Sequence, residues 1–161
     1  MQFVLIDKII DLEPGDRITA VKCLTQSEEY LEDHFPLFPV MPGVLMLQSL
    51  FEAGAWLVRA SEDFAHSVVR LKEARNIKYA DFVKPGQLMT VTAQIHKEDA
   101  QTTQVKASGT VDGRTAVSGR LVLERLNLAE ADPQQAPTDA YTIRRMRERF
   151  KLLYQPVATE A

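Results

Sequence analysis

The apolar segment at residues 43–58 constrains the fold of this chain more than any other feature. Its only polar side chains are those of Gln48, Ser49 and Glu52. A helix that is apolar on nearly all sides is a buried helix, and about 16 residues at 1.5 Å each span roughly 24 Å. Because a membrane span needs about 20 apolar residues, we predict instead that the rest of a small domain wraps this helix. Gln48 and Glu52 are four residues apart and share one stripe of it.

Strand patterns dominate the rest of the chain. Apolar and polar residues alternate as they do in half-buried strands, and turn residues separate the segments, most clearly Asp112-Gly113. The expected strands lie within residues 17–24, 67–79, 88–96, 102–111 and 115–126. Residues 2–13 can form a short helix or a strand, and we favour a short turn followed by a strand. Several antiparallel strands and one buried helix predict an α+β domain.

The last part of the chain has a different pattern. Residues 129–138 are polar and contain prolines, which predicts a linker. Helical periodicity resumes at residues 138–154, where Thr138 or Asp139 can cap a second, arginine-rich helix. We expect disorder at residues 155–161.

Length and composition narrow the class of protein. A chain of 161 residues fits one domain, which we place at residues 1–127, followed by the linker and basic helix at residues 128–161. The net charge of −3 argues against nucleic acid as the main partner. The single cysteine, Cys23, excludes an intrachain disulfide. Charges at Asp7 and Lys8 interrupt the apolar core that a signal peptide needs, so we expect a cytoplasmic protein.

A proline-rich loop with one histidine precedes the buried helix. Residues 34–45 read HFPLFPVMPGVL, in which each proline fixes its own φ and biases the preceding residue toward extended geometry. Two flanking segments accompany this motif, FVLIDKIIDLEPGDRITAVK at residues 3–22 and FVKPGQL at residues 82–88. With these three segments in order, the chain resembles the β-hydroxyacyl–acyl-carrier-protein dehydratases of the FabZ/FabA type. The resemblance covers roughly residues 1–125.

The resemblance implies a hotdog fold, in which a curved antiparallel sheet wraps one long central helix. It also implies a lyase of fatty-acid or polyketide synthesis that needs no cofactor. Such an enzyme removes water from a 3-hydroxyacyl thioester on acyl-carrier protein or coenzyme A and leaves a trans-2-enoyl thioester. The family builds its site across a dimer interface, so we expect a homodimer or a trimer of dimers.

The family's catalytic roles fall on the loop and on the start of the helix. A histidine takes the C2 proton, which makes His34 the expected base, a role that suits histidine near neutral pH. A backbone N–H at the helix start polarises the thioester carbonyl, which points to Gly43 and Val44. The motif residues Phe35 and Pro42 are expected to contact substrate. We expect no metal, because no cysteine or second histidine lies near His34 at ligand spacing.

The acid departs from the family's pattern. By the family's spacing the acidic residue stands where this chain has Gln48, and Glu52 stands where the family typically has glutamine. An amide can donate a hydrogen bond but cannot give up a proton at a useful pH. Three interpretations follow. Glu52 has taken the acid role; or Gln48 orients a hydroxyl group or water in a site with different chemistry; or the domain binds acyl thioesters or a paralogous subunit without dehydration. A thioesterase is a weaker alternative on the same fold.

Structural interpretations of the same residues stay open. His34 can be a loop histidine bonded to the backbone. Gln48 and Glu52 can be a buried pair that bond one another. The basic face at residues 144–151 can be solvated, or it can attract an acidic carrier protein.

Overall fold

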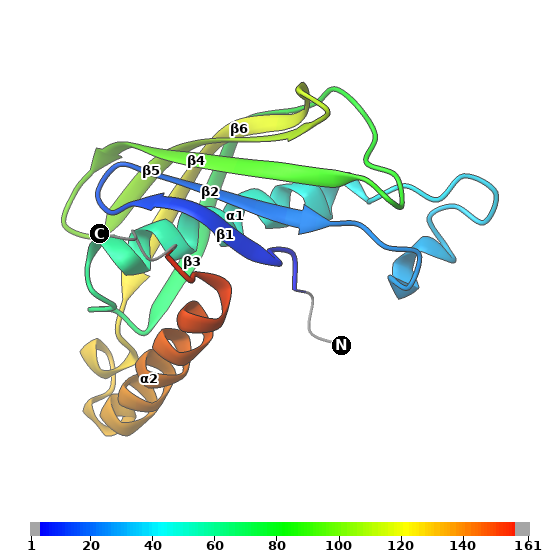
Figure 1. The fold of residues 1–161 in the computed structure, drawn as a ribbon. Coiled ribbons are helices and arrows are strands. Elements are labelled where there is room, and N and C mark those ends of the chain that lie inside the picture. Colours follow the sequence, from blue (N-terminus) through cyan, green and yellow to red (C-terminus); the bar gives the residue numbers. More distant parts are fainter. Residues whose placement is uncertain (1–3, 157–161) are drawn as a thin grey trace, which may run out of the picture.

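The computed structural model describes residues 4–156, which form one antiparallel sheet and two α-helices (Figure 1). The strands are β1 (Lys8–Glu13), β2 (Arg17–Cys23), β3 (Val68–Tyr79), β4 (Leu88–Glu98), β5 (Thr102–Val111) and β6 (Arg114–Leu126). They lie in the order β1-β2-β4-β5-β6-β3, and every neighbouring pair is antiparallel. Each expected strand is confirmed, with differences only at its ends.

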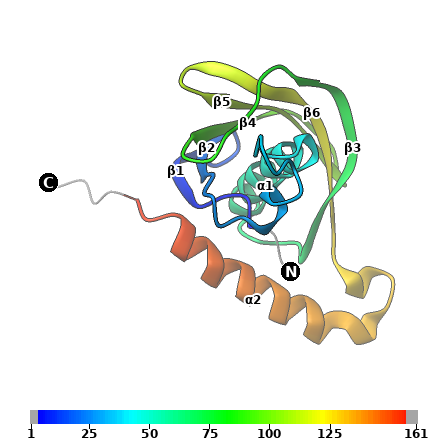
Figure 2. The same cartoon turned by 90° about the vertical axis from the view of Figure 1, so that its right-hand side faces the viewer.

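The helix α1 (Gly43–Ser61) lies inside the curve of this sheet (Figure 2). Side chains such as Leu50 are fully buried between helix and sheet. Gly54 faces the sheet, and a Cβ there would lie 3.1 Å from Cδ1 of Leu123 and 3.3 Å from Cγ2 of Val105. The missing side chain lets the helix approach the strands closely. The predicted hotdog fold, a curved sheet wrapped around one central helix, is confirmed.

Strands β1 and β3 form the two edges of the sheet. Among the strands of residues 4–156, β3 pairs with β6 alone, and most of its side chains are exposed. It ends at Tyr79, whose ring lies so close to Gly43 that a Cβ on the glycine would be 3.1 Å from Cε1 of the ring. The open edge of β3 therefore ends beside the start of α1.

The C-terminal part of the chain departs from the prediction. The linker expected at residues 129–138 forms two short 3-10 turns, and α2 (Ala136–Leu153) begins directly after them. The residue before the helix is Gln135, which makes no side-chain cap. The predicted cap by Thr138 or Asp139 is therefore wrong, because the second turn runs straight into the helix.

Asp139 holds the start of α2 in another way. Its buried carboxylate accepts hydrogen bonds from the N–H groups of Leu128 at 3.0 Å and Ala129 at 2.8 Å. The hydroxyl group of Ser67 donates to the same carboxylate. Because Ser67 directly precedes β3, these bonds join the C-terminal helix to the sheet.

The apolar side of α2 packs on the end of α1. Phe150 contacts three aromatic rings, with centroid distances of 6.0 Å to Trp56, 5.5 Å to Phe64 and 5.6 Å to Tyr154. Figure 2 shows α2 running across the side of α1 that the sheet leaves open. The helix is thus part of the packed domain.

Two further sequence expectations concern the C-terminal residues and the possibility of a membrane-spanning helix. The disorder expected at residues 155–161 falls mostly outside the described residues. Neither helix of residues 4–156 has the length and apolar character needed to cross a membrane.

Candidate active site

The loop between β2 and α1 holds His34 by its backbone and by its ring. The backbone N–H of His34 donates to the carbonyl of Tyr30 at 3.0 Å, and its carbonyl accepts from the N–H of Val40 at 3.0 Å. Nδ1 of the ring lies 2.8 Å from the carbonyl oxygen of Val40. Since a carbonyl only accepts, Nδ1 carries the proton and Nε2 of the neutral ring keeps a lone pair. The loop therefore presents the tautomer that a general base needs.

A pocket of about 270 Å³ opens beside this ring, and we call it the histidine pocket. Its lining consists of His34, Val40, Met41, Gly43, Met46, Tyr79, Ala80, Asp81 and Phe82. The structure thus brings His34 and Gly43 into one pocket, the residues expected to act as base and as carbonyl-binding donor.

The start of α1 supplies backbone donors to this region. The first hydrogen bonds of the helix run from the N–H groups of Leu45, at 2.9 Å, and Met46, at 3.1 Å, to the carbonyl of Pro42. The N–H groups of Gly43 and Val44 precede these bonds, at the positive end of the helix dipole. Charge that develops on a carbonyl oxygen at this place would be stabilised.

The other motif residues lie around the helix start in different ways. The ring of Phe35 stacks on that of His34, with a centroid distance of 4.2 Å. Pro42 is the residue that immediately precedes α1. The side chain of Val44 is exposed and lines a second pocket.

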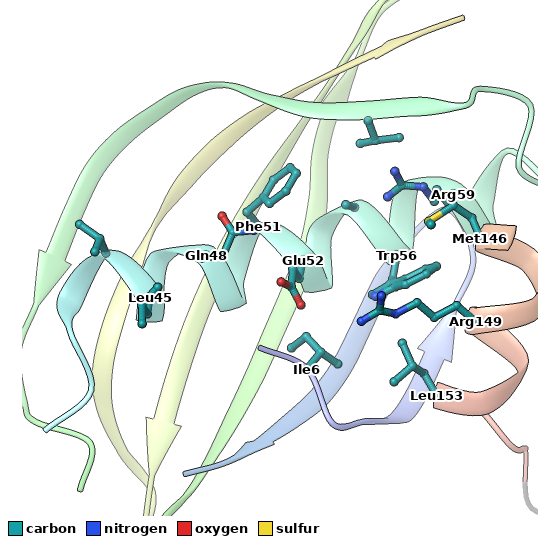
Figure 3. Close-up of a pocket in the computed structure, with 13 residues that line it drawn as sticks. Ile6, Leu45, Gln48, Phe51, Glu52, Trp56, Arg59, Met146, Arg149 and Leu153 are labelled. Atoms are coloured by element: carbon teal, nitrogen blue, oxygen red, sulfur yellow. The ribbon is translucent and has the colours of Figure 1, made fainter. Parts of the chain in front are cut away.

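This second pocket, of about 570 Å³, runs along α1 between the N-terminal segment and α2 (Figure 3). We call it the glutamate pocket, because Glu52 and Gln48 both line it. Oε2 of Glu52 accepts the N–H of Leu5 at 3.1 Å, and the side chain of Gln48 also bonds the Glu52 carboxylate. The interpretation in which Gln48 and Glu52 bond one another is therefore present in the structure.

The environment of Glu52 acts on its proton affinity in two directions. Burial raises the pKa of Glu52 above that of an exposed glutamate, and this effect is the largest. The hydrogen bonds from Leu5 and Gln48 and the charges of Arg149 and Lys22 oppose it. The net pKa is raised, so the carboxyl group keeps its proton to a higher pH, as a general acid requires.

Within one chain, His34 and Glu52 line different pockets. The acidic side chain of the histidine pocket is Asp81, which the sequence analysis missed. Its carboxylate accepts the N–H of Phe82 at 2.8 Å and lies 3.7 Å from the guanidinium group of Arg114. A signal for Asp81 exists in the sequence, since it lies two residues after the predicted strand at residues 67–79.

The sequence analysis also missed the contribution of α2 to the glutamate pocket. Met146, Arg149 and Leu153 line this pocket together with Trp56 and Arg59 of α1. The spacing of Met146 and Leu153 indicates an apolar face of α2. The sequence does not show which surface this face packs on, because the tertiary fold sets it.

Within the described residues, no three His, Cys, Asp or Glu side chains are gathered so as to hold a metal ion. The candidate chemistry is carried by a histidine, a carboxyl group and backbone donors. Such groups transfer protons and stabilise developing negative charge.

Residues 1–120 match the family of FabA-like domains. Over 119 residues the chain is 34% identical to the 3-hydroxyacyl-[acyl-carrier-protein] dehydratase FabZ of Ruminiclostridium cellulolyticum, a match that covers 74% of this chain and 84% of that one. It is 37% identical over 119 residues to the enzyme of the same name from Lactococcus lactis subsp. cremoris, covering 74% and 82%.

Solved structures show the same fold at lower identity. The dehydratase heterocomplex ApeI:P from Xenorhabdus doucetiae matches with a TM-score of 0.64 and 15% identity, over 83% of this chain and 90% of that one. The PaaI protein of E. coli, from the phenylacetic acid degradation operon, matches with a TM-score of 0.59 and 18% identity, over 73% and 82%. The helix α2 lies beyond residues 1–120, which the family match covers.

Proposed function

This chain belongs to the family of FabA-like domains, and from this premise we propose that it is a 3-hydroxyacyl-[acyl-carrier-protein] dehydratase of fatty-acid synthesis. The reaction removes water from a 3-hydroxyacyl thioester and gives a trans-2-enoyl thioester. One observation carries the proposal. The histidine pocket holds His34, in the tautomer of a base, beside the first backbone N–H of α1 at Gly43. An acyl-carrier-protein thioester as substrate and a cytoplasmic location go with this proposal.

Proton removal is the role of His34. Nε2 takes a proton from C2 of the acyl chain, and the Nδ1 bond to Val40 keeps the ring oriented as it becomes cationic. Negative charge moves onto the thioester oxygen. The N–H groups of Gly43 and Val44 stabilise that charge at the helix start.

Loss of the hydroxyl group needs an acid, and we assign this role to Glu52. As the bond between C3 and oxygen breaks, the protonated Glu52 gives its proton to the departing hydroxyl group, which leaves as water. The electrons of the broken C2–H bond form the new double bond. Burial keeps Glu52 protonated to a higher pH, and Gln48, which bonds the carboxylate, holds it in place or orients the hydroxyl group.

A site with both groups needs two copies of the chain, because His34 and Glu52 line different pockets of one chain. We therefore propose a homodimer in which His34 of one protomer meets Glu52 of its partner. The open edge of β3, which ends at Tyr79 in the histidine pocket, fits a surface where two sheets join.

The test is turnover measured from both directions. Purified protein is given either a 3-hydroxyacyl or a trans-2-enoyl thioester of acyl-carrier protein, and both are expected to reach the same equilibrium mixture. His34→Ala is expected to abolish this. His96→Ala, on the exposed side of β4, is the matched control and keeps full activity. Turnover that survives His34→Ala removes His34 from the mechanism.

Gln48 favours a second candidate function. Where the resembling family has its acid, this chain has an amide, which cannot supply a proton. The second candidate is therefore a domain that binds acyl thioesters, or pairs with a paralogous chain that brings the acid. It predicts saturable binding of acyl thioesters by the purified protein without water loss.

A further inference from the structure

We propose that the glutamate pocket is an acyl-binding groove whose far end, lined in part by α2, selects acyl chains that terminate in a carboxylate group. This inference rests on the proposed function, because it takes the Glu52 end of the pocket as the reacting end. It goes beyond that function by naming the class of acyl chain and the residues that recognise it.

The pocket has the length and lining of an acyl-binding groove. From Glu52 to Arg59 it follows α1 for seven residues, which is about 10 Å at 1.5 Å per residue. Its walls are largely apolar and include Phe51, Trp56 and Leu153 (Figure 3). A medium-length carbon chain that starts beside Glu52 would end near Arg59.

Arg59 has an unmet donor at that end. Its Nε atom is buried and has no hydrogen-bond partner, while its guanidinium group lies 5.6 Å from the centre of the Trp56 ring. Burial lowers the pKa of Arg59 to about 10, which leaves the group charged at neutral pH. A buried charged donor without an acceptor is unfavourable. An oxyanion on the ligand would satisfy it.

Arg149, from α2, adds a second cation between the far end of the pocket and Glu52, and its charge lowers the pKa of Glu52. Figure 3 shows its side chain reaching from this helix past Trp56, into the pocket where Glu52 also points. Two other arginines of α2 have partners that do not line this pocket. Arg147 bonds the carboxylate of Asp63 at 2.9 Å, and the exposed Arg144 lies over the ring of Tyr141.

The charges of the lining explain why a carboxylate fits. The pocket holds two guanidinium groups, of Arg59 and Arg149, and one carboxyl group, of Glu52. With Glu52 protonated as the proposed acid, the lining carries an excess of positive charge that a ligand carboxylate would reduce. Glu62, outside the lining, offsets only part of the effect of burial on Arg59. An acyl chain with a methyl end would displace water from both guanidinium groups without forming hydrogen bonds to replace the lost ones. A carboxylate can accept two parallel N–H bonds from a guanidinium group.

The test measures binding without turnover. Trp56 lines the pocket and is the single tryptophan of the chain, so its fluorescence reports occupancy. The probes are octanoyl-pantetheine and its ω-carboxy counterpart, which carry neither phosphate nor carrier protein. We expect the ω-carboxy thioester to bind at least about tenfold tighter. Arg59→Gln is expected to remove this preference and Arg149→Gln to weaken it, whereas Arg144→Gln, which deletes an exposed charge of α2, is expected to keep it.

Four results would overturn the proposal, of which three concern the two thioesters. These three are equal affinity for the two thioesters, a preference that persists in Arg149→Gln and Arg59→Gln alike, and fluorescence that does not change with either probe while turnover continues. A fourth is a gain from the phosphate of octanoyl-phosphopantetheine that Arg149→Gln abolishes, since the arginines would then read the carrier arm. If Arg59→Gln lowers the melting temperature of the protein, Arg149→Gln is the variant that decides the test. A carboxylate preference in a protein without turnover would refute the dehydratase function but keep the selectivity.

Discussion

Nδ1 of His34 donates to the carbonyl oxygen of Val40 across 2.8 Å, and this bond leaves Nε2 as the basic nitrogen of the neutral ring. We predict that nitrogen NMR of the neutral ring shows a protonated Nδ1 and an unprotonated Nε2. The exposed His96 is the internal control and should show the mixture of tautomers typical of a solvated ring. A ring of His34 with its proton on Nε2 would contradict the assigned base.

Gly43 has no room for a side chain. A Cβ would lie 3.1 Å from Cε1 and 3.2 Å from Cδ1 of the Tyr79 ring, tighter than ordinary contact. We predict that Gly43→Ala displaces this ring and lowers kcat/KM by about 10- to 100-fold, since small misplacements at a reacting site have effects of that size. Gly43→Ala with Tyr79→Ala relieves the contact and should recover part of the loss. A double variant as slow as Gly43→Ala would mean that the ring is not the cause.

Substitutions at Gln48 and Glu52 separate the interpretations of the acid. If Glu52 is the acid, Glu52→Gln lowers kcat by about 100- to 10,000-fold, the usual range for general acid catalysis. Gln48→Glu then changes kcat little. The reverse pattern, a large gain from Gln48→Glu and no loss from Glu52→Gln, would show that the wild-type protein is a weakened enzyme or a binding domain. Steady-state kinetics on an enoyl thioester measures both variants.

The raised pKa of Glu52 predicts a pH-dependent stability. Below the pKa of an unfolded glutamate, about 4.3, both states are protonated and the group has no effect. As the pH rises, the unfolded chain releases this proton first, so the free energy of unfolding falls until the folded pKa is passed. Glu52→Gln lacks this loss. Urea unfolding from pH 4 to 8 should show the variant gaining on the wild type as the pH rises; a constant difference would contradict the raised pKa.

Ser67 tests how α2 is attached. Its buried hydroxyl donates to Asp139, the residue that also binds two backbone N–H groups before α2. We predict that Ser67→Ala lowers the free energy of unfolding by about 1.5–3 kcal/mol, the usual net value of a hydrogen bond to a charged group. Ser27→Ala removes an exposed hydroxyl group, 2.7 Å from that of Thr25, and should change stability by less than about 0.5 kcal/mol. Equal effects would mean that the buried bond does not stabilise the helix.

The sequence predicts the elements that depend on local pattern. The apolar run at residues 43–58 defines α1, and the alternation after residue 67 defines the strands, because burial on one face leaves a period in the sequence. Gly54, within that run, faces Leu123 and Val105 of the sheet.

Other features depend on contacts between distant parts of the chain. Arg149 influences Glu52 although the two are far apart in sequence, and nothing in the periodicity of α2 names its neighbour. Asp139 has the residue type and place of a helix cap, yet its partners are Ser67 and the backbone of the preceding turn. The same residue types satisfy either pattern, so only the folded arrangement decides between them.

The helix α2 is a segment of the chain separate from the loop that orients His34. The loop that orients His34 precedes α1, whereas Arg149 and Leu153 come after the last strand and touch the opposite end of the same helix. Substitutions in the C-terminal helix can therefore reshape what the domain accepts while the geometry around His34 stays unchanged. Acyl selectivity could therefore change through substitutions in α2, in evolution or by design.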